Sequence, residues 1–179
     1  MTRRLIPLLA AAVLALAGCG SQSDTDAGHN DADVTFAQQM IPHHQQAVEM
    51  AEMALDPARE ASEPVRDLAG RIGDAQQPEI ETMQGWLEDW DAKAEDHSDH
   101  DMDGMTGMMS DDQMSALAAA TGTDFDRMWL QMMIEHHEGA VEMAETEVAD
   151  GQDSQAKALA RAIIDAQRAE ITEMTRLLA

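Results

Sequence analysis

The sequence is poor in positive charge, in aromatic side chains and in cysteine. Only 11 lysine and arginine residues stand against 35 aspartate and glutamate residues, so the 179-residue chain carries a formal net charge of −24. This balance argues against a nucleic-acid-binding protein, because neutralising phosphates requires a basic surface. The chain has no tyrosine, two phenylalanines and three tryptophans, whereas its 15 methionines exceed what ordinary packing uses. The composition favours helices over sheets, and the length suits one domain.

The single cysteine, Cys19, lies at the end of an apolar N-terminal run. Arg3 and Arg4 precede this run, which spans residues 5–17 and is shorter than the roughly 20 residues of a transmembrane helix. These features are typical of a secretory signal. The ending Leu-Ala-Gly-Cys resembles a bacterial lipobox, which implies a lipid on the sulfur of Cys19; the alternative is a plain signal peptide with an incidental cysteine. We predict a signal peptide over 1–18, a lipidated cysteine and flexible tether over 19–33, and an exported protein that is periplasmic or lipid-anchored on the outer face of the cytoplasmic membrane.

An internal repeat determines the predicted architecture. Residues 40–52 and 133–145 share the motif Met-x-x-His-His-x-x-Ala-Val-Glu-Met-Ala-Glu, and residues 68–87 match 159–178 in the same order. Each half therefore predicts two amphipathic helices joined by a short link, and the two halves together predict an all-α four-helix bundle with pseudo-twofold symmetry. Within a domain over 34–179 we expect a first hairpin over 34–95, a linker over 96–122, a second hairpin over 123–179, and a kink at Pro78.

The linker between the halves is rich in histidine and methionine. No helical or strand period is visible over 96–110, whereas residues 111–120 predict a short capped helix. Thioether and imidazole groups are soft-to-borderline ligands that suit copper. We therefore predict metal binding by the linker, with the alternative that its apolar residues fold back onto the bundle. The candidate ligands are His97, His100, Met102, Met105, Met108 and Met109.

Helical spacing places polar residues in the predicted core. At about 100° per residue, the second histidine of each motif lies near the middle of the apolar arc of its helix, and the first lies at its edge. The methionine four residues before the central histidine shares its face. These residues are Met40, His43 and His44 in the first repeat and Met133, His136 and His137 in the second. On the other two helices, the apolar arc includes Gln76, Glu79, Gln167 and Glu170.

Three interpretations of this layer stay open, because a buried carboxylate is costly unless it is paired or bound to a metal. In the first, the central histidines His44 and His137 pair with the two glutamates in a structural network that fixes helix register. In the second, the central histidines join Met40 and Met133 as soft ligands for copper. In the third, the bundle holds a dinuclear iron or manganese site, but the Glu-x-x-His motifs of such sites are missing. We favour the network for the Glu and Gln positions and metal for the His and Met positions.

The two histidine motifs, the Gln-x-x-Glu-Ile-x-x-Met runs at 76–83 and 167–174, and the Met/His-rich linker resemble the bacterial DUF305 family. The resemblance covers residues 34–179. It implies an exported protein with a ferritin-like four-helix fold, in a family of which some members bind copper and are tied to copper resistance. It also implies metal contacts at His43, His44, Met50, His136, His137, Met143 and the linker. Glu135 and Gly139 replace Pro42 and Gln46 of the first copy, and neither change removes a candidate ligand.

The sequence carries no recognisable arrangement for catalysis, since it has neither a Gly-x-Ser-x-Gly nucleophile motif nor a glycine-rich phosphate loop. We therefore predict a non-enzymatic lipoprotein that binds copper through His/Met sites for buffering or resistance, with an acidic surface that concentrates cations. The alternatives are a non-metal structural or interaction lipoprotein with a buried His/Glu network and, less favoured, a di-iron protein. The expected partners are a metal ion and, through the lipid anchor only, the membrane. No nucleic acid is expected, and homo-oligomer formation and a protein partner stay open.

Overall fold

The computed structural model describes residues 28–92 and 106–179, so the predicted signal peptide, Cys19 and four linker residues, His97, His100, Met102 and Met105, lie outside the described residues. All regular structure in the described part is helical. Along the chain the elements are α1 (Asp31–Leu55), the 3-10 helix η1 (Pro57–Arg59), α2 (Glu63–Asp89), α3 (Asp111–Ala119), α4 (Gly122–Asp150) and α5 (Ser154–Leu178). None of these described helices combines the length and apolar character needed to cross a membrane.

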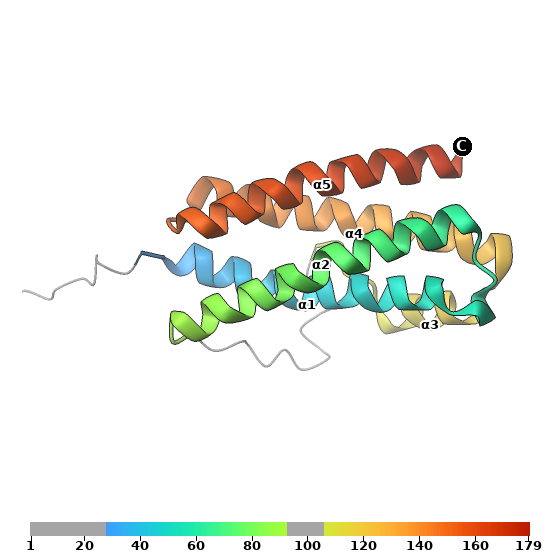
Figure 1. Ribbon diagram of the computed structural model, residues 1–179, viewed down its shortest axis with the longest axis horizontal. Coiled ribbons are helices and arrows are strands. Elements are labelled where there is room, and N and C mark those ends of the chain that lie inside the picture. The colour runs from blue at the N-terminus through green and yellow to red at the C-terminus, as the bar shows by residue number, and fades with distance from the viewer. Residues whose placement is uncertain (1–27, 93–105) are drawn as a thin grey trace, which may run out of the picture.

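The four long helices form a bundle of two hairpins. Helix α1 packs along α2, α4 packs along α5, and the two hairpins meet mainly through α1 and α4. Figure 1 shows the long helices following the long axis of the molecule, with α3 at one end. The predicted all-α four-helix bundle made of two repeated hairpins is thereby confirmed.

The first helix begins earlier than the sequence analysis predicted. Asn30 caps α1 by accepting hydrogen bonds from the backbone N–H groups of Ala32 and Asp33, at 2.9 and 3.1 Å. In return, the Asp33 carboxylate accepts a hydrogen bond from the backbone N–H of Asn30. This capping box starts the helix at Asp31. The prediction of a flexible tether over 19–33 is therefore wrong at its last residues, which belong to the fold.

Capping residues also define the starts of α3 and α5. Ser110 and Gln113 form a capping box at the start of α3, which confirms the short helix predicted in the linker. Asp153 accepts hydrogen bonds from two backbone N–H groups in the first turn of α5. Helix α2 continues through Pro78, and the kink there stays a prediction.

The apolar core of the bundle is divided into two clusters. Cluster one lies at the end of the bundle near α3 and includes Phe125, Trp129 and Leu117. Cluster two lies at the opposite end, around Phe36 and Met83. Each long helix contributes buried residues to both clusters, so each helix must cross from one cluster to the other near its middle.

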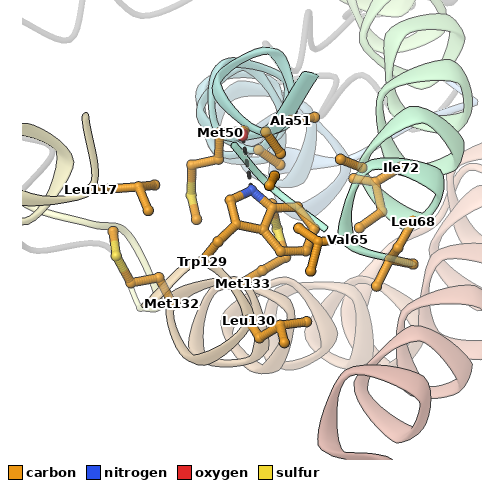
Figure 2. Packing of buried hydrophobic residues seen from close by; sticks show 14 of the residues in the cluster. Met50, Ala51, Val65, Leu68, Ile72, Leu117, Trp129, Leu130, Met132 and Met133 are labelled. Carbon is orange, nitrogen blue, oxygen red and sulfur yellow. Dashed lines mark hydrogen bonds between the residues drawn. The ribbon is translucent and has the colours of Figure 1, made fainter. Parts of the chain in front are cut away.

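Cluster one is organised around Trp129 of α4. Its indole N–H donates a 2.8 Å hydrogen bond to the backbone carbonyl of Met50 on α1, drawn as the dashed line in Figure 2. Figure 2 also shows Val65 and Leu68 of α2 and Met133 of α4 around the ring. Because a buried indole N–H needs a partner, this bond ties α4 to α1 in addition to the apolar contacts.

Candidate metal site

A layer of polar side chains separates the two apolar clusters. On α1, two adjacent histidines lie between Met40 of cluster two and Ala47 of cluster one. On each of the other three long helices, polar residues likewise lie between the residues of cluster one and those of cluster two. We call these residues the polar layer. Its four histidines are 0 % exposed and its two glutamines are buried, which agrees with the symmetric buried layer expected from the sequence. The polar layer consists of His43, His44, Gln76, Glu79, His136, His137, Gln167 and Glu170.

Two of the four histidines, His44 and His137, pair with carboxylates of their own hairpin, and we call them the outer histidines. Nε2 of His44 lies 2.8 Å from Oε2 of Glu79 on α2, and Nε2 of His137 lies 2.7 Å from Oε2 of Glu170 on α5. The glutamate side chains are 22 % and 16 % exposed, so their carboxylates also reach solvent. The Nδ1 atom of each outer histidine is buried without a hydrogen-bond partner. The pairing expected for a structural network is thus present in the structure.

The other two, His43 and His136, face one another across the two hairpins, and we call them the inner histidines. Their ring centroids lie 3.7 Å apart, with an angle of 38° between the ring planes. No hydrogen bond of ordinary geometry reaches any of their four ring nitrogens, although the Thr106 backbone lies close to His43 and the His43 backbone lies close to His136. The two inner rings are therefore in direct contact, and none of their nitrogens is paired with another side chain.

Burial controls the charge of the inner histidines. It lowers the pKa of His43 to about 3, helped by the nearby His44 and His137, whereas the Thr106 backbone raises this pKa slightly. The pKa of His136 is held well below its ordinary value by burial first and then by the three other histidines. Both inner rings are therefore neutral at pH 7, and neutral imidazole is the form that binds metal ions.

The structure corrects the position expected for the inner histidines. The sequence analysis placed His43 and His136 at the edge of the apolar arc, yet both are 0 % exposed. The arc of a single helix describes the face toward one neighbour, whereas α1 and α4 each pack against two other long helices. The interface between α1 and α4 covers the edge of the apolar arc, so the burial of His43 and His136 depends on the tertiary structure.

The structure does not bring together the predicted set of Met40, Met133 and the outer histidines. Met40 lies in cluster two and Met133 in cluster one, because α1 and α4 run in opposite directions past the polar layer. Met133 instead shares cluster one with Met50, while Met143 packs against the cluster that contains Met40. Each side of the polar layer therefore carries the first methionine of one motif copy and the last methionine of the other copy.

The described end of the linker folds back onto the bundle. Met109 is a buried member of cluster one, and Met108 is half-buried. The Gln46 side chain of α1 holds Met109 by two hydrogen bonds: its amide N–H donates to the Met109 carbonyl at 2.8 Å, and its amide oxygen accepts from the Met109 N–H at 2.7 Å. For Met109 the structure thus matches the alternative interpretation, in which an apolar linker residue packs on the bundle.

The same part of the linker also contacts α4 through glycine. A Cβ atom on Gly139 would lie 2.2 Å from the Thr106 carbonyl oxygen, and one on Gly107 would lie 2.8 Å from the Glu135 carbonyl oxygen. Gly107 also has a φ of 81°, which disfavours other residues. Gly139 occupies the position of Gln46 in the repeat. The two copies thus differ where the linker attaches. In the first copy the Gln46 side chain hydrogen-bonds to the linker, and in the second copy Gly139 has no side chain, which lets the linker backbone approach α4.

A buried carboxyl pair, Asp33 and Glu147, was missed by the sequence analysis. Burial first, and then the neighbouring Asp33 carboxylate, raise the pKa of Glu147 to about 8. Burial also raises the pKa of Asp33, but hydrogen bonds from the backbone of Asn30, Asp153 and Gln152 and from Glu147 outweigh this effect and lower it. The pair thus joins the start of α1 to the connection between α4 and α5.

The repeat contains part of the signal for this pair. An offset of 93 relates Asp33 to Asp126, whose carboxylate accepts a hydrogen bond from the Ser62 N–H at the start of α2. The same offset relates Glu147 to Ala54. Asp33 was therefore predictable as a residue that caps the helix of the other hairpin, whereas nothing in the repeat indicates a buried acid at Glu147.

The donor set of the polar layer limits which ions it fits. Within residues 28–92 and 106–179, no three His, Cys, Asp or Glu side chains are grouped so that they could hold a metal ion. This argues against the dinuclear carboxylate site of the third interpretation and equally against a site of three converging histidines, so a site in this layer would have to combine histidine nitrogen with methionine sulfur. Imidazole nitrogen and thioether sulfur together suit a softer ion such as copper. The neutral inner histidines and the motif methionines on both sides of the layer are donors of this kind.

Comparison with known proteins gives a family and several solved structures. The family model DUF305, described as a domain of unknown function, matches residues 33–178. A DUF305 protein from Streptomyces coelicolor, described as secreted, is 38% identical, with 82% of this chain and 91% of that chain covered and a TM-score of 0.75. A DUF305 fragment from Deinococcus radiodurans is 31% identical, with 83% and 96% covered and a TM-score of 0.75. No curated protein matches the chain.

A third similar structure is a metal complex. CopM in its Cu(I)-bound form is 32% identical to this chain, with 81% of this chain and 94% of CopM covered and a TM-score of 0.67. CopM structures with Cu(II) and with Ag bound are similar to the same degree. A protein with this fold and a related sequence therefore binds copper and silver.

Proposed function

We propose a metal-binding function for this chain, which belongs to the DUF305 family, with copper as the ion it binds. The observation that carries the proposal is the presence of six buried ring nitrogens without hydrogen-bond partners on four neighbouring histidines. Buried polar atoms without partners are rare and costly, and a bound metal ion is one group that would satisfy them. The twofold repetition of the pattern indicates a site built jointly by both hairpins.

The outer histidines are prepared for metal binding by their carboxylates. When Nε2–H donates to a glutamate, the proton of the neutral ring is on Nε2, and Nδ1 carries a free lone pair. His44 and His137 fit this arrangement, because their Nε2 atoms lie within hydrogen-bond distance of Glu79 and Glu170 and their Nδ1 atoms are buried and unpartnered. A carboxylate on the far nitrogen also orients the ring and raises its basicity as a ligand. Glu79 and Glu170 thus support metal binding and fix helix register at the same time.

Copper is the favoured ion because of the softness of the available donors. Thioether and imidazole ligands select Cu(I) over harder ions, whereas Mg²⁺, Ca²⁺ and Mn²⁺ prefer carboxylate and carbonyl oxygen. The ability of CopM to hold Cu(I), Cu(II) and Ag supports this choice by similarity. We place the ligands among the inner and outer histidines and the motif methionines Met40, Met50, Met133 and Met143, with linker donors His97, His100, Met102, Met105 and Met108 contributing a second, weaker site.

We further propose that the protein acts as an exported lipoprotein that buffers copper. The lipobox-like ending at Cys19 supports lipid anchoring, and the net charge of −24 would concentrate cations near the protein. Complete burial of the four histidines supports binding over catalysis, because a catalytic metal needs an open coordination position. Buffering outside the cytoplasm would protect the cell from excess copper.

The test is a competition titration of residues 20–179 with Cu(I), Cu(II), Ag(I) and Zn(II) against chelators of known affinity. The proposal predicts tight Cu(I) and Ag(I) binding that is lost when His43 and His136 are both changed to Leu. His29→Ala is the matched control, since His29 stacks on Trp90 outside the polar layer. Equal binding of zinc and copper, or unchanged copper binding in the double variant, would contradict the proposal.

A second candidate function is favoured by the two His–Glu hydrogen bonds. In this alternative, the polar layer only sets the register of the four helices, and the protein is a structural or interaction lipoprotein that binds no metal. The two functions differ in what the inner histidines contribute. A purely structural layer gains nothing from unpartnered nitrogens, so it predicts that no tested metal raises the thermal stability of the wild-type protein.

A further inference from the structure

A cavity of about 370 Å³ lies between the first turns of α1 and the second half of α4. Its walls come from both hairpins, and residue 106 of the linker forms part of its lining. The lining is mixed: carboxylates and hydroxyls stand beside the thioether of Met143 and the ring of Phe36. We call this space the entrance cavity.

Two helix faces lead from the entrance cavity to the inner histidines. On α1, Asp31, Thr35 and Gln39 line the cavity at intervals of four residues, and His43 is the next residue in this series. On α4, Met143 lines the cavity, and His136 lies seven residues, or about two helical turns, further toward the polar layer. Residues at these spacings share one face of a helix. The cavity and the inner histidines therefore lie along the same seam between α1 and α4.

Residues 106–107, which we call the cover segment, contact both the cavity and the part of α4 that carries His136. Thr106 lines the cavity and its backbone also acts on the His43 ring. Gly107 packs against the backbone of α4 at Glu135 and His136. Because both inner histidines are 0 % exposed, an ion cannot reach them unless a covering group moves. The cover segment is a short stretch of linker, so its movement would leave the four-helix core intact.

Two contacts hold the cover segment in place. Gln46 fixes the adjacent Met109 backbone by two hydrogen bonds, and Gly139 allows the Thr106 carbonyl to approach α4. Both occur at the same position of the repeated motif, and the two copies carry different residues there. The position one turn after the inner histidine in each repeat is therefore specialised for linker attachment.

From this arrangement we infer that the entrance cavity is the route by which a soft metal cation enters and leaves the inner histidine pair, with Met143 as its first sulfur donor and the cover segment as the gate. The inference depends on the proposed function and adds the route and the control of exchange. Exposed Asp31 and Glu142 at the cavity attract the cation, and Met143 selects a soft ion before it reaches His43 and His136.

The experiment measures how fast full-length protein loaded with one equivalent of Cu(I) releases it to an excess of a coloured Cu(I) chelator. Gly139→Ala is the principal variant, because its Cβ would lie 2.2 Å from the Thr106 carbonyl and must displace the cover segment. Gly70→Ala is the matched control: it is also a helical glycine, and its Cβ would meet nothing within 4 Å. We expect faster release from Gly139→Ala and wild-type release from Gly70→Ala.

A second variant covers the case in which Gly139→Ala disturbs folding. Gln46→Ala removes the two hydrogen bonds to Met109 without adding an atom, and it should speed both loading and release about fivefold to tenfold, as expected for the loss of two hydrogen bonds. Met143→Leu should slow loading while leaving the folded structure unchanged. In Gly139→Ala and Gln46→Ala, the Cu(I) affinity should change less than the rate of loading or the rate of release.

The outcomes separate this inference from the proposed function. If wild-type protein does not bind Cu(I), the proposed function fails and the route fails with it. If wild-type protein binds Cu(I) but Gly139→Ala and Gln46→Ala release it at the wild-type rate, the route is wrong and the function stands.

Discussion

The inner and outer histidines are neighbours in the sequence, yet their surroundings differ completely. Each outer histidine donates to a glutamate of its own hairpin, whereas the inner histidines contact each other between the hairpins. The cause is the turn of about 100° between successive helical residues, which directs adjacent side chains toward different neighbouring helices. A His-His pair thus joins two interfaces, one inside the hairpin and one between the hairpins. The outer residue is held by a carboxylate, and the ring nitrogens of the inner residue are buried without a side-chain partner.

The largest expected effect comes from removing the inner pair. His43→Leu combined with His136→Leu should weaken Cu(I) binding by about 100-fold or more, since even second-layer partners of metal ligands are worth 10- to 100-fold. The free energy of unfolding should change by less than about 1.5 kcal/mol, because leucine replaces nitrogens that make no hydrogen bond. Chelator competition and urea unfolding measure the two quantities. If the double variant instead loses much of its stability and keeps its copper binding, the inner histidines have a structural role and not a metal-binding one.

Removing the carboxylates of the outer pair should affect both quantities. Glu79→Ala combined with Glu170→Ala leaves two buried Nε2–H groups without an acceptor, which should lower the free energy of unfolding by about 1–3 kcal/mol per site. Cu(I) affinity should fall by about 10- to 100-fold through loss of ring orientation. The same two measurements apply. If the double variant keeps wild-type stability, the outer histidines do not have the structural role assigned to them.

The carboxyl pair at the end of the bundle offers a contrast to both histidine pairs. Between the ordinary glutamate pKa of 4.5 and about 8, folded protein keeps a proton on Glu147 that the unfolded chain has released. Stability should therefore fall as the pH rises through this window, by at most about 1.4 kcal/mol per pH unit. Asp33 acts oppositely: its lowered pKa adds stability that is lost as the pH falls below the ordinary aspartate value of 3.8.

Urea unfolding at several pH values from mildly acidic to mildly alkaline measures this dependence. Glu147→Gln keeps a neutral side chain at every pH and should flatten the decline. Glu49→Gln, an exposed residue of α1, is the matched control and should leave the slope unchanged. The assignment fails if both variants retain the wild-type slope.

The smallest stability effect is expected at the motif methionines. Met50→Leu and Met143→Leu nearly conserve volume, so each should change the free energy of unfolding by less than about 1.5 kcal/mol. If sulfur contributes to binding, each should nevertheless lower the preference for Cu(I) over Zn(II), because only the soft donor is lost. Met128→Leu, a partly buried methionine outside the repeated motif, is the control. Unchanged preference in both motif variants would assign metal binding to the histidines alone.

The repeat explains how much of the site was predictable. Apolar spacing placed His44, Glu79 and their copies in one layer of the core, and the structure pairs them as one of the interpretations required. Met40 and Met133 lie in different apolar clusters, because opposite helix directions place equal positions of the two copies on opposite sides of the layer. Periodicity in one helix contains no information on the direction of its partner.

Contacts between distant segments were the least predictable. The attachment of Met109 to Gln46 and the close approach of Thr106 to Gly139 join residues 63 and 33 positions apart, and neither is part of a periodic pattern. The pairing of Asp33 with Glu147 is similar, since burial of an acid at Glu147 follows from the return of the chain at Gly151. The sequence shows that Gly139 and Gln46 differ at the same position of the repeat, but it does not show that the linker packs against both positions.

The amino-acid sequence by itself determined the all-helical class, the two hairpins and the presence of a buried polar layer, because helix periodicity and internal repetition are local properties of the chain. It also determined the family. Only the tertiary structure decided which histidines contact each other, which are held by carboxylates, and which residues cover the seam between α1 and α4. These features depend on the relative direction and rotation of packed helices, which side chains from all four helices fix together in three dimensions.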